Sequence, residues 1–153
     1  MVRLSDLDEN LRAIIETYPA STFDAPAMVD GPPLYERRVA IVSTAGLHCR
    51  DDRPFDFMSS DYRIIPGDVT ANDLVMSHIS VNFDRTGFSQ DLNTVFPIDR
   101  LREMAAEGSI AGLADYHYSF MGATDAESME PAARNLAGLF RKDNVTAILL
   151  VPV

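Results

Sequence analysis

The sequence predicts an α/β protein: a Rossmann-like three-layer sandwich on a mainly parallel central sheet that we expect to be incomplete at its C-terminal end. Apolar runs at 38–46 and 146–153 are typical of strands covered on both faces, and two amphipathic helices lie between them. The order strand, helix, helix, strand favours parallel pairing with right-handed crossovers. No internal repeat interrupts this pattern.

The N-terminal segment is predicted to be a helix followed by an arm. Apolar residues recur there at steps of three and four, and Ser5 is a plausible N-cap; the apolar positions are Leu4, Leu7, Leu11, Ile14 and Ile15. Prolines and a glycine then crowd residues 19–36, which indicates an arm over the surface. We therefore expect residues 1–36 to form the helix and Pro-rich arm and residues 37–153 to form the α/β domain.

Within the second unit, the first central strand is predicted at 38–46. Short β segments follow at 62–65 and 74–79, separated by a Pro-Gly-Asp turn at 66–68. Helices are predicted at 97–107, where Gly108 ends the pattern, and at about 126–142, before the last strand.

Composition limits the function classes. The 153 residues carry a net charge of −10, which opposes binding to nucleic acid phosphates. No run of about 20 apolar residues occurs, and the acidic N-terminus lacks the apolar core of a secretory signal, so we expect a cytoplasmic protein without a membrane span. The single cysteine, Cys49, cannot form an internal disulfide, and no Cys or His pair has zinc-site spacing.

Three histidines provide the candidate catalytic groups. His48 follows the first strand, where open α/β sheets bind their ligands. Its neighbour Cys49 is either a thiolate activated by the imidazolium or an inert buried thiol. His78 ends a predicted strand and precedes Arg85, which is suited to a substrate carboxylate, although the same segment fits a structural loop. His117 lies in an aromatic segment that is either a pocket wall or plain core.

Known nucleotide signatures are missing from the sequence. Ala45-Gly46-Leu47-His48 is not a dinucleotide fingerprint, and no P-loop or Ser-His-Asp pattern is recognisable. A flavin- or nucleotide-dependent oxidoreductase is therefore disfavoured.

Several blocks along the chain carry a family resemblance. The segments 39–48, 55–56, 62–66, 77–78, 91–101, 117–122 and 147–153 occur in order. The most specific motifs are Asn-x-Val-Phe-Pro-x-Asp-Arg-Leu at 93–101 and His-Tyr-Ser-Phe-Met-Gly at 117–122. Together they resemble the selenoprotein B family of glycine, sarcosine, betaine and D-proline reductases. The resemblance covers most of the chain.

The resemblance implies where the redox chemistry would lie. In the family, the strand similar to 149–153 leads into a motif with selenocysteine, or cysteine in some members, followed by another cysteine and a helix. Because UGA is read as stop in ordinary translation, we expect the natural residue after Val153 to be selenocysteine and this chain to be a truncated, inactive product. A deliberate domain boundary is the competing explanation.

The implied reaction is reductive cleavage of a small amino-acid-type substrate by a selenolate or thiolate, with no cofactor required in this chain. On this view His48, His78 and His117 are candidate proton donors, and Arg85, Tyr118 and Ser119 are candidate substrate contacts. Implied partners are other reductase subunits and a thioredoxin-like or selenoprotein carrier. The alternative function is a non-catalytic small-ligand-binding or assembly module that forms a homo-oligomer through its sheet edge.

Overall fold

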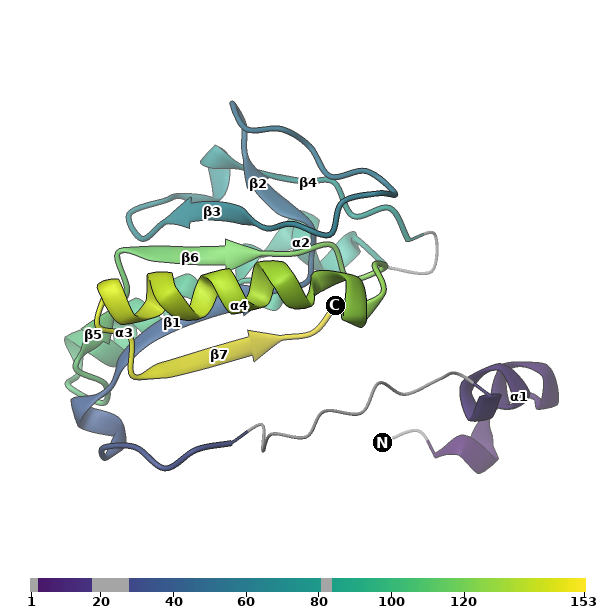
Figure 1. Ribbon diagram of the computed structural model, residues 1–153, viewed down its shortest axis with the longest axis horizontal. Helices are drawn as coiled ribbons and strands as arrows, with labels where there is room; N and C mark the ends of the chain where they lie inside the picture. The colour runs from purple at the N-terminus through teal and green to yellow at the C-terminus, as the bar shows by residue number, and fades with distance from the viewer. Residues whose placement is uncertain (1–2, 18–27, 81–83) are drawn as a thin grey trace.

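The computed structural model describes residues 3–17, 28–80 and 84–153, and its centre is a mixed β-sheet (Figure 1). The strands of this sheet are β1 (Arg38–Ser43), β3 (Arg63–Pro66), β5 (Gly112–Leu113), β6 (Tyr116–Ser119) and β7 (Ala147–Val151). A separate antiparallel pair contains β2 (Leu47–Cys49) and β4 (Leu74–Met76), with the 3₁₀ turn η3 (Ala71–Asp73) before β4.

Strand β1 organises the main sheet. It pairs in parallel with β5, β6 and β7, and the longest register runs from Val39 opposite Ala147 to Ser43 opposite Val151. Strand β3 is antiparallel to β6. The predicted α/β class is therefore confirmed, whereas the Rossmann-like, mainly parallel arrangement is not, because the sheet is mixed.

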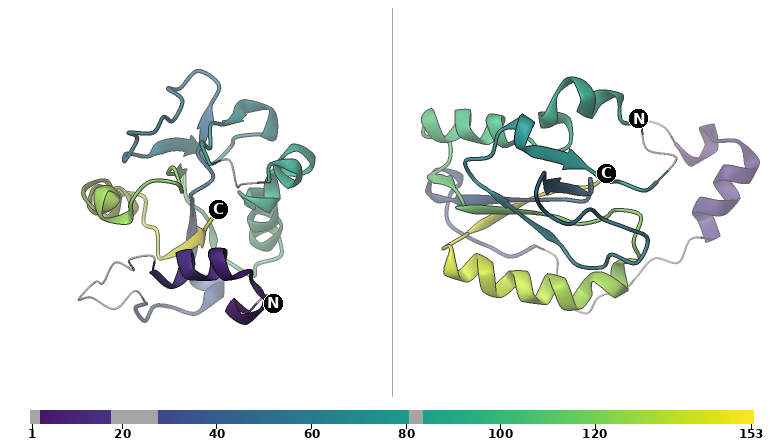
Figure 2. Two further views of the ribbon diagram at one scale, coloured as in Figure 1. Left: turned by 90° about the vertical axis from the view of Figure 1, so that its right-hand side faces the viewer. Right: turned by 90° about the horizontal axis from the view of Figure 1, so that it is seen from above.

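Helices cover both faces of the sheet. Figures 1 and 2 place α4 (Ala126–Lys142) on one face, and α2 (Thr86–Gln90) with α3 (Ile98–Ala106) on the other. The 3₁₀ turn η4 (Leu92–Thr94) lies between α2 and α3 in the sequence and contributes Leu92 to the core. The predicted helices at 97–107 and 126–142 are thus confirmed.

The core follows from the alternation of side chains along β1. Val39 and Ile41 belong to the cluster under α3, whereas Ala40 belongs to the cluster under α4, because successive side chains of a strand point to opposite faces. Both faces are covered, which explains why β1 reads as a continuous apolar run.

Strands β6 and β4 differ from the sequence prediction. Residues 114–122 were expected to be a pocket wall or core, and 116–119 form a strand in the middle of the sheet. Tyr116 is exposed, whereas His117, Tyr118 and Ser119 are all buried, although they point to both faces of the sheet. The strand therefore lacks the alternation of polar and apolar residues that identifies a strand from its sequence. The strand predicted at 74–79 also ends earlier, at Met76.

The N-terminal segment contains the 3₁₀ turn η1 (Leu4–Asp6) and helix α1 (Glu9–Thr17), neither of which has a buried residue. The backbone N–H of Leu11 donates to Asp8 Oδ1 at 3.0 Å, so Asp8 caps the helix and the predicted Ser5 cap is wrong. Residues 19–27 of the predicted arm lie outside the described residues. The arm continues through η2 (Leu34–Glu36) into β1.

Parallel pairing aligns the carboxyl ends of β1, β6 and β7 at one edge, on the right of Figure 1 beside the C-terminus. Ligands of α/β sheets bind at the carboxyl ends of the strands, so this edge is the candidate site.

In the described parts of the chain, no helix has the length and apolar character needed to cross a bilayer.

Candidate functional site

The carboxyl ends of the three parallel strands converge on Thr44, the residue after β1. Its backbone N–H donates to the Val151 carbonyl at 3.0 Å, and its carbonyl accepts from the Gly122 N–H at 2.8 Å. Its hydroxyl accepts from the Val153 N–H at 2.8 Å and donates to the Val153 carbonyl at 3.2 Å. Thr44 thus joins the end of β1 to the segments that follow β6 and β7.

Glycines allow this close approach. A Cβ on Gly122 would overlap the Val153 carbonyl oxygen and would lie 2.9 Å from the Thr44 carbonyl oxygen. Gly46 has a φ of +65°, and a Cβ there would lie 3.0 Å from the His78 backbone nitrogen. Only residues without side chains fit at these two positions, so the convergence is sterically fixed.

His78 lies beside this convergence and is 5% exposed. Its Nδ1 accepts from the Ser80 N–H at 3.2 Å, which leaves Nε2 as the protonated nitrogen of the neutral ring. Burial and the nearby Arg85 charge lower the pKa of His78 and outweigh a hydrogen bond to the Val153 backbone that raises it. His78 is therefore a neutral imidazole held next to the end of β7.

Arg85, predicted to bind a substrate carboxylate, contacts main-chain oxygens. Its Nη2 donates to the His78 carbonyl and, at 3.4 Å, to the Ser80 carbonyl. These contacts hold the segment that carries His78. Substrate binding by Arg85 stays a prediction.

His48 is 3% exposed and forms a hydrogen-bonded chain with its neighbours. Its Nδ1 lies 2.7 Å from the Cys49 carbonyl oxygen and its Nε2 lies 2.7 Å from Ser77 Oγ. Because a carbonyl can only accept, we assign the proton to Nδ1, and Ser77 then donates to Nε2. Burial and nearby aspartates raise the pKa of Cys49, which opposes the thiolate considered from the sequence.

His117, Tyr118 and Ser119 occupy the interior of the sheet. His117 Nδ1 accepts from the Ile41 N–H at 2.9 Å, and Ser119 Oγ accepts from the Leu47 N–H at 2.9 Å. Ile41 precedes Thr44 by three residues, so this bond lies about 10 Å back along β1 from the convergence. His117 is fully buried, and burial lowers its pKa to about 4.

Tyr118 points to the opposite face. Its ring packs edge-on against Tyr62 at a centroid distance of 5.4 Å and against Phe140 at 5.2 Å. The structure therefore places His78 at the strand ends, whereas His117, Tyr118 and Ser119 support the core. Among the described residues, no three His, Cys, Asp or Glu side chains are grouped to hold a metal ion.

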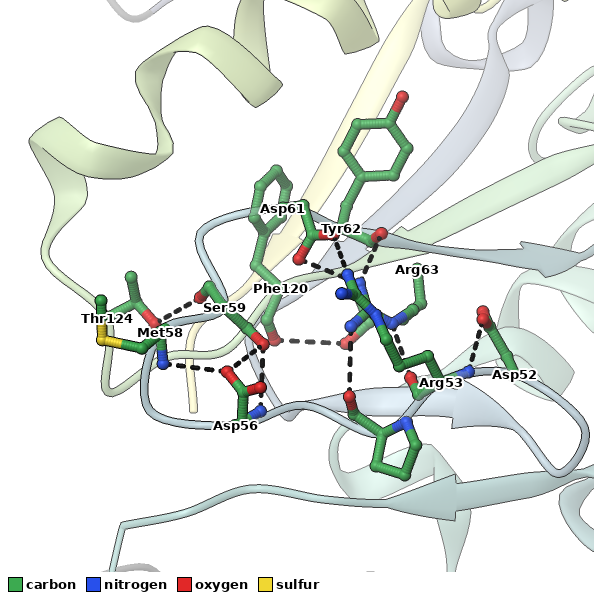
Figure 3. A network of polar contacts seen from close by, with 12 residues as sticks. Asp52, Arg53, Asp56, Met58, Ser59, Asp61, Tyr62, Arg63, Phe120 and Thr124 are labelled. Atoms are coloured by element: carbon green, nitrogen blue, oxygen red, sulfur yellow. Dashed lines mark hydrogen bonds and ion pairs between the residues drawn. The ribbon is translucent and has the colours of Figure 1, made fainter.

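A loop at 50–62 lies beside the same edge and is held by Arg63 (Figure 3). The Arg63 side chain is 4% exposed, and it donates to the carbonyls of Arg53 at 2.7 Å, Tyr62 at 3.1 Å and Pro54 at 3.2 Å. It also forms a 3.0 Å ion pair with Asp61.

The tip of this loop is tied to the segment after β6. Thr124 donates to the Ser59 carbonyl at 2.9 Å, and Asp56 accepts from the Met58 N–H at 2.9 Å. Phe57 and Met58 at the tip are 82% and 88% exposed. The loop thus presents two apolar side chains on a fixed backbone near the strand ends.

An apolar depression of about 240 Å³ adjoins the convergence. It is lined by Thr44 and Phe120 and by four residues of α4, Ala126, Met129, Glu130 and Ala133. Sequence reasoning missed Thr44, Gly122 and Arg63. The small residues after the first strand and the glycine closing the 117–122 motif were the signals for the first two, whereas an isolated arginine carried none.

Comparison with known proteins supports the family resemblance that the sequence motifs carry. Residues 27–153 match the family described as glycine/sarcosine/betaine reductase selenoprotein B. D-proline reductase subunit gamma of Acetoanaerobium sticklandii is 34% identical over 120 residues, which are 76% of this chain and 49% of that subunit. Sarcosine reductase complex component B subunit beta of Peptoclostridium acidaminophilum is 29% identical over 144 residues, 87% of this chain and 32% of that subunit.

Glycine reductase complex component B subunit gamma of Carboxydothermus hydrogenoformans is 32% identical over 84 residues, 54% of this chain and 19% of that subunit. The chain thus spans half or less of the length of these relatives. No solved structure matches it. Since the family match extends over most of the chain, the protein belongs to the glycine/sarcosine/betaine reductase selenoprotein B family.

Proposed function

We propose that this chain is part of a reductase-complex subunit that reductively cleaves a small amino-acid-type substrate at the carboxyl end of the sheet. The observation that carries the proposal is the convergence of Thr44, Gly122 and Val153 beside His78, at the edge where α/β sheets bind ligands. Membership of the family supplies the reaction class.

The nucleophile we propose is a selenocysteine or cysteine that follows Val153 in the natural protein. The resemblance implies that its selenolate or thiolate displaces the leaving group and becomes bonded to the substrate carbon. A nearby thiolate then attacks the selenium or sulfur and forms a selenenylsulfide or disulfide, while the substrate carbon departs with the bonding electron pair and takes up a proton. An external dithiol reduces the selenenylsulfide or disulfide for the next turnover. The proposal is supported by the order at this strand end, where Val153 is hydrogen-bonded to Thr44 through both its N–H and its carbonyl.

The residues of this chain would bind the substrate and stabilise its leaving group. His78 is the histidine that we assign to the leaving group, because it is buried and next to Val153; its neutral ring would stabilise that group by donating a hydrogen bond. The apolar depression against α4 would accept the carbon part of the substrate. His117 is better placed to complete the hydrogen bonding of β1 than to reach the substrate.

The test begins with the gene. An in-frame UGA after the Val153 codon, followed by a cysteine-containing coding segment, is the expected result. The protein produced with selenocysteine insertion should consume a small amino acid in the presence of a dithiol and the companion subunits, and replacement of the selenocysteine by serine should abolish consumption. A UAA or UAG codon without a downstream frame would contradict the proposal.

A second candidate function is an assembly module, and strand β7 favours it. Its pairing in the described residues is with β1, and Ile148, Leu149 and Leu150 are 46%, 36% and 69% exposed. An apolar edge strand invites pairing with another chain. Light scattering tests this candidate: concentration-dependent dimers that Leu150→Lys abolishes would support it, and a monomer at all concentrations would contradict it.

A further inference from the structure

The hydroxyl of Thr44 makes an unusual pair of contacts at the end of the sheet. The backbone ladder between β1 and β7 reaches its last bond where the Thr44 N–H donates to the Val151 carbonyl. Beyond that point the Thr44 side chain replaces the backbone as the partner of β7. Its Oγ1 accepts from the Val153 N–H at 2.8 Å and donates to the Val153 carbonyl at 3.2 Å. One hydroxyl thus satisfies both polar groups of Val153, as a partner strand would.

Steric contact fixes the same residue from another side. Gly122 lies so close to the Val153 carbonyl that a Cβ would overlap it, and that Cβ would also lie 3.0 Å from Thr44 Oγ1. The Val153 carbonyl is therefore confined between a hydrogen-bonding hydroxyl and a backbone wall. A residue joined to Val153 by a planar peptide bond would therefore extend in a direction set by these contacts.

We propose that Thr44 is a positioning residue whose hydroxyl aims the residue following Val153 at the substrate. This inference rests on the proposed function, in which that residue is the nucleophile. A valine at position 44 has nearly the same shape but no hydroxyl, so it would remove the two Thr44 side-chain hydrogen bonds to Val153 and leave the contact of His78 with the Val153 backbone in place. Misplacement of a reacting group by about 1 Å can cost roughly 100-fold in rate.

The experiment uses the natural-length protein with its companion subunits and compares Thr44→Val with Thr44→Ser. We expect Thr44→Val to lower kcat by roughly 10- to 100-fold at nearly unchanged KM, because the hydroxyl is bonded to Val153 and valine keeps a methyl group in the apolar depression. Thr44→Ser retains the hydroxyl and should stay within about threefold of the wild type. The rate of iodoacetamide alkylation at the nucleophile should change in parallel with kcat.

Several outcomes would overturn the inference. Wild-type kcat in Thr44→Val excludes the positioning role, and an equal loss in Thr44→Ser assigns the effect to the methyl group and not to the hydroxyl. If Thr44→Val fails to fold, Thr44→Ala removes the hydroxyl without placing a methyl in its space, and normal kcat in that variant overturns the inference. A protein without a reactive selenol or thiol after Val153 fails at the earlier gene test and overturns the proposed function as well.

Discussion

The amino end and the carboxyl end of β1 are held by different kinds of interaction. At the amino end, Arg38 bonds to Asp143 Oδ1 at 2.5 Å and to Asp115 Oδ1 at 2.7 Å. At the carboxyl end, neutral groups of Thr44, Gly122 and Val153 are held by hydrogen bonds and close packing. The contribution of the amino end to the free energy of unfolding should therefore depend on pH. The contribution of the carboxyl end should instead be sensitive to a single added methyl group.

The largest expected effect comes from adding that methyl group at the carboxyl end. Gly122→Ala should destabilise the fold by about 3 kcal/mol, because main-chain atoms of Val153 and Thr44 must move. Gly138→Ala in α4 is the matched control: it meets nothing within 4 Å and should stabilise the helix by about 0.5–1 kcal/mol. Urea unfolding of both variants measures the contrast. Equal effects in the two variants would show that the carboxyl end is not tightly packed.

His117 sharpens the comparison because it lies between the two ends. Its Nδ1 accepts from the buried Ile41 N–H, so His117→Phe should cost about 1–3 kcal/mol at pH 7 by leaving that donor unpaired. His117→Asn can keep an acceptor there and should cost less. A larger loss in the asparagine variant than in the phenylalanine variant would contradict this account.

The lowered pKa of His117 predicts that the free energy of unfolding decreases in acid. Its folded pKa of about 4 lies below the ordinary histidine value, so the unfolded chain binds a proton first as pH falls. Stability from the neutral ring is complete above about pH 6.5 and falls towards pH 4, by roughly 3 kcal/mol in total. Urea unfolding across this range should show a flatter profile for His117→Asn than for the wild type.

Asp143→Asn tests the amino end with an intermediate effect. Burial raises the pKa of Asp143, but hydrogen bonds from Arg38 and from the backbone of Tyr116 and Asp115 outweigh it, and the folded pKa is lowered. The contribution is therefore present above about pH 4 and lost as pH falls through the lowered folded value. We expect a loss of about 1–2 kcal/mol at pH 7 that shrinks in acid. A loss independent of pH would refute a charge-based contribution.

Asp115→Asn should have the smallest effect. Asp115 is 77% exposed and shares Arg38 with Asp143, so its ion pair is well solvated. We expect a change of about 0.5 kcal/mol or less, reduced further by salt. A loss as large as that of Asp143→Asn would mean that both carboxylates act as one unit.

The sequence was sufficient to predict the elements with strong periodicity. Strand β1 and helices α3 and α4 were predicted from apolar runs and amphipathic spacing, and the family followed from ordered blocks. Strand β6 was missed because burial on both faces removes the alternation that identifies strands. The antiparallel placement of β3 depends on long-range pairing, which local patterns do not specify.

The candidate site was predictable only in part. Strand-end logic drew attention to His78, which does lie at the convergence. The same logic could not separate it from His117, because exposure and hydrogen-bond partners depend on the folded chain. Thr44 was not singled out because its importance comes from Val153, 109 positions away in the sequence.

The clamp on the 50–62 loop has an evolutionary consequence. Arg63 holds the loop by donating to main-chain carbonyls, and every residue type offers the same carbonyl. Arg63 and the contacts of Asp56 and Thr124 therefore hold the path of the loop, whereas the exposed side chains of Phe57 and Met58 contribute little to it. Substitutions at the exposed positions 57 and 58 can therefore change the surface beside the strand ends without changing the backbone beneath it.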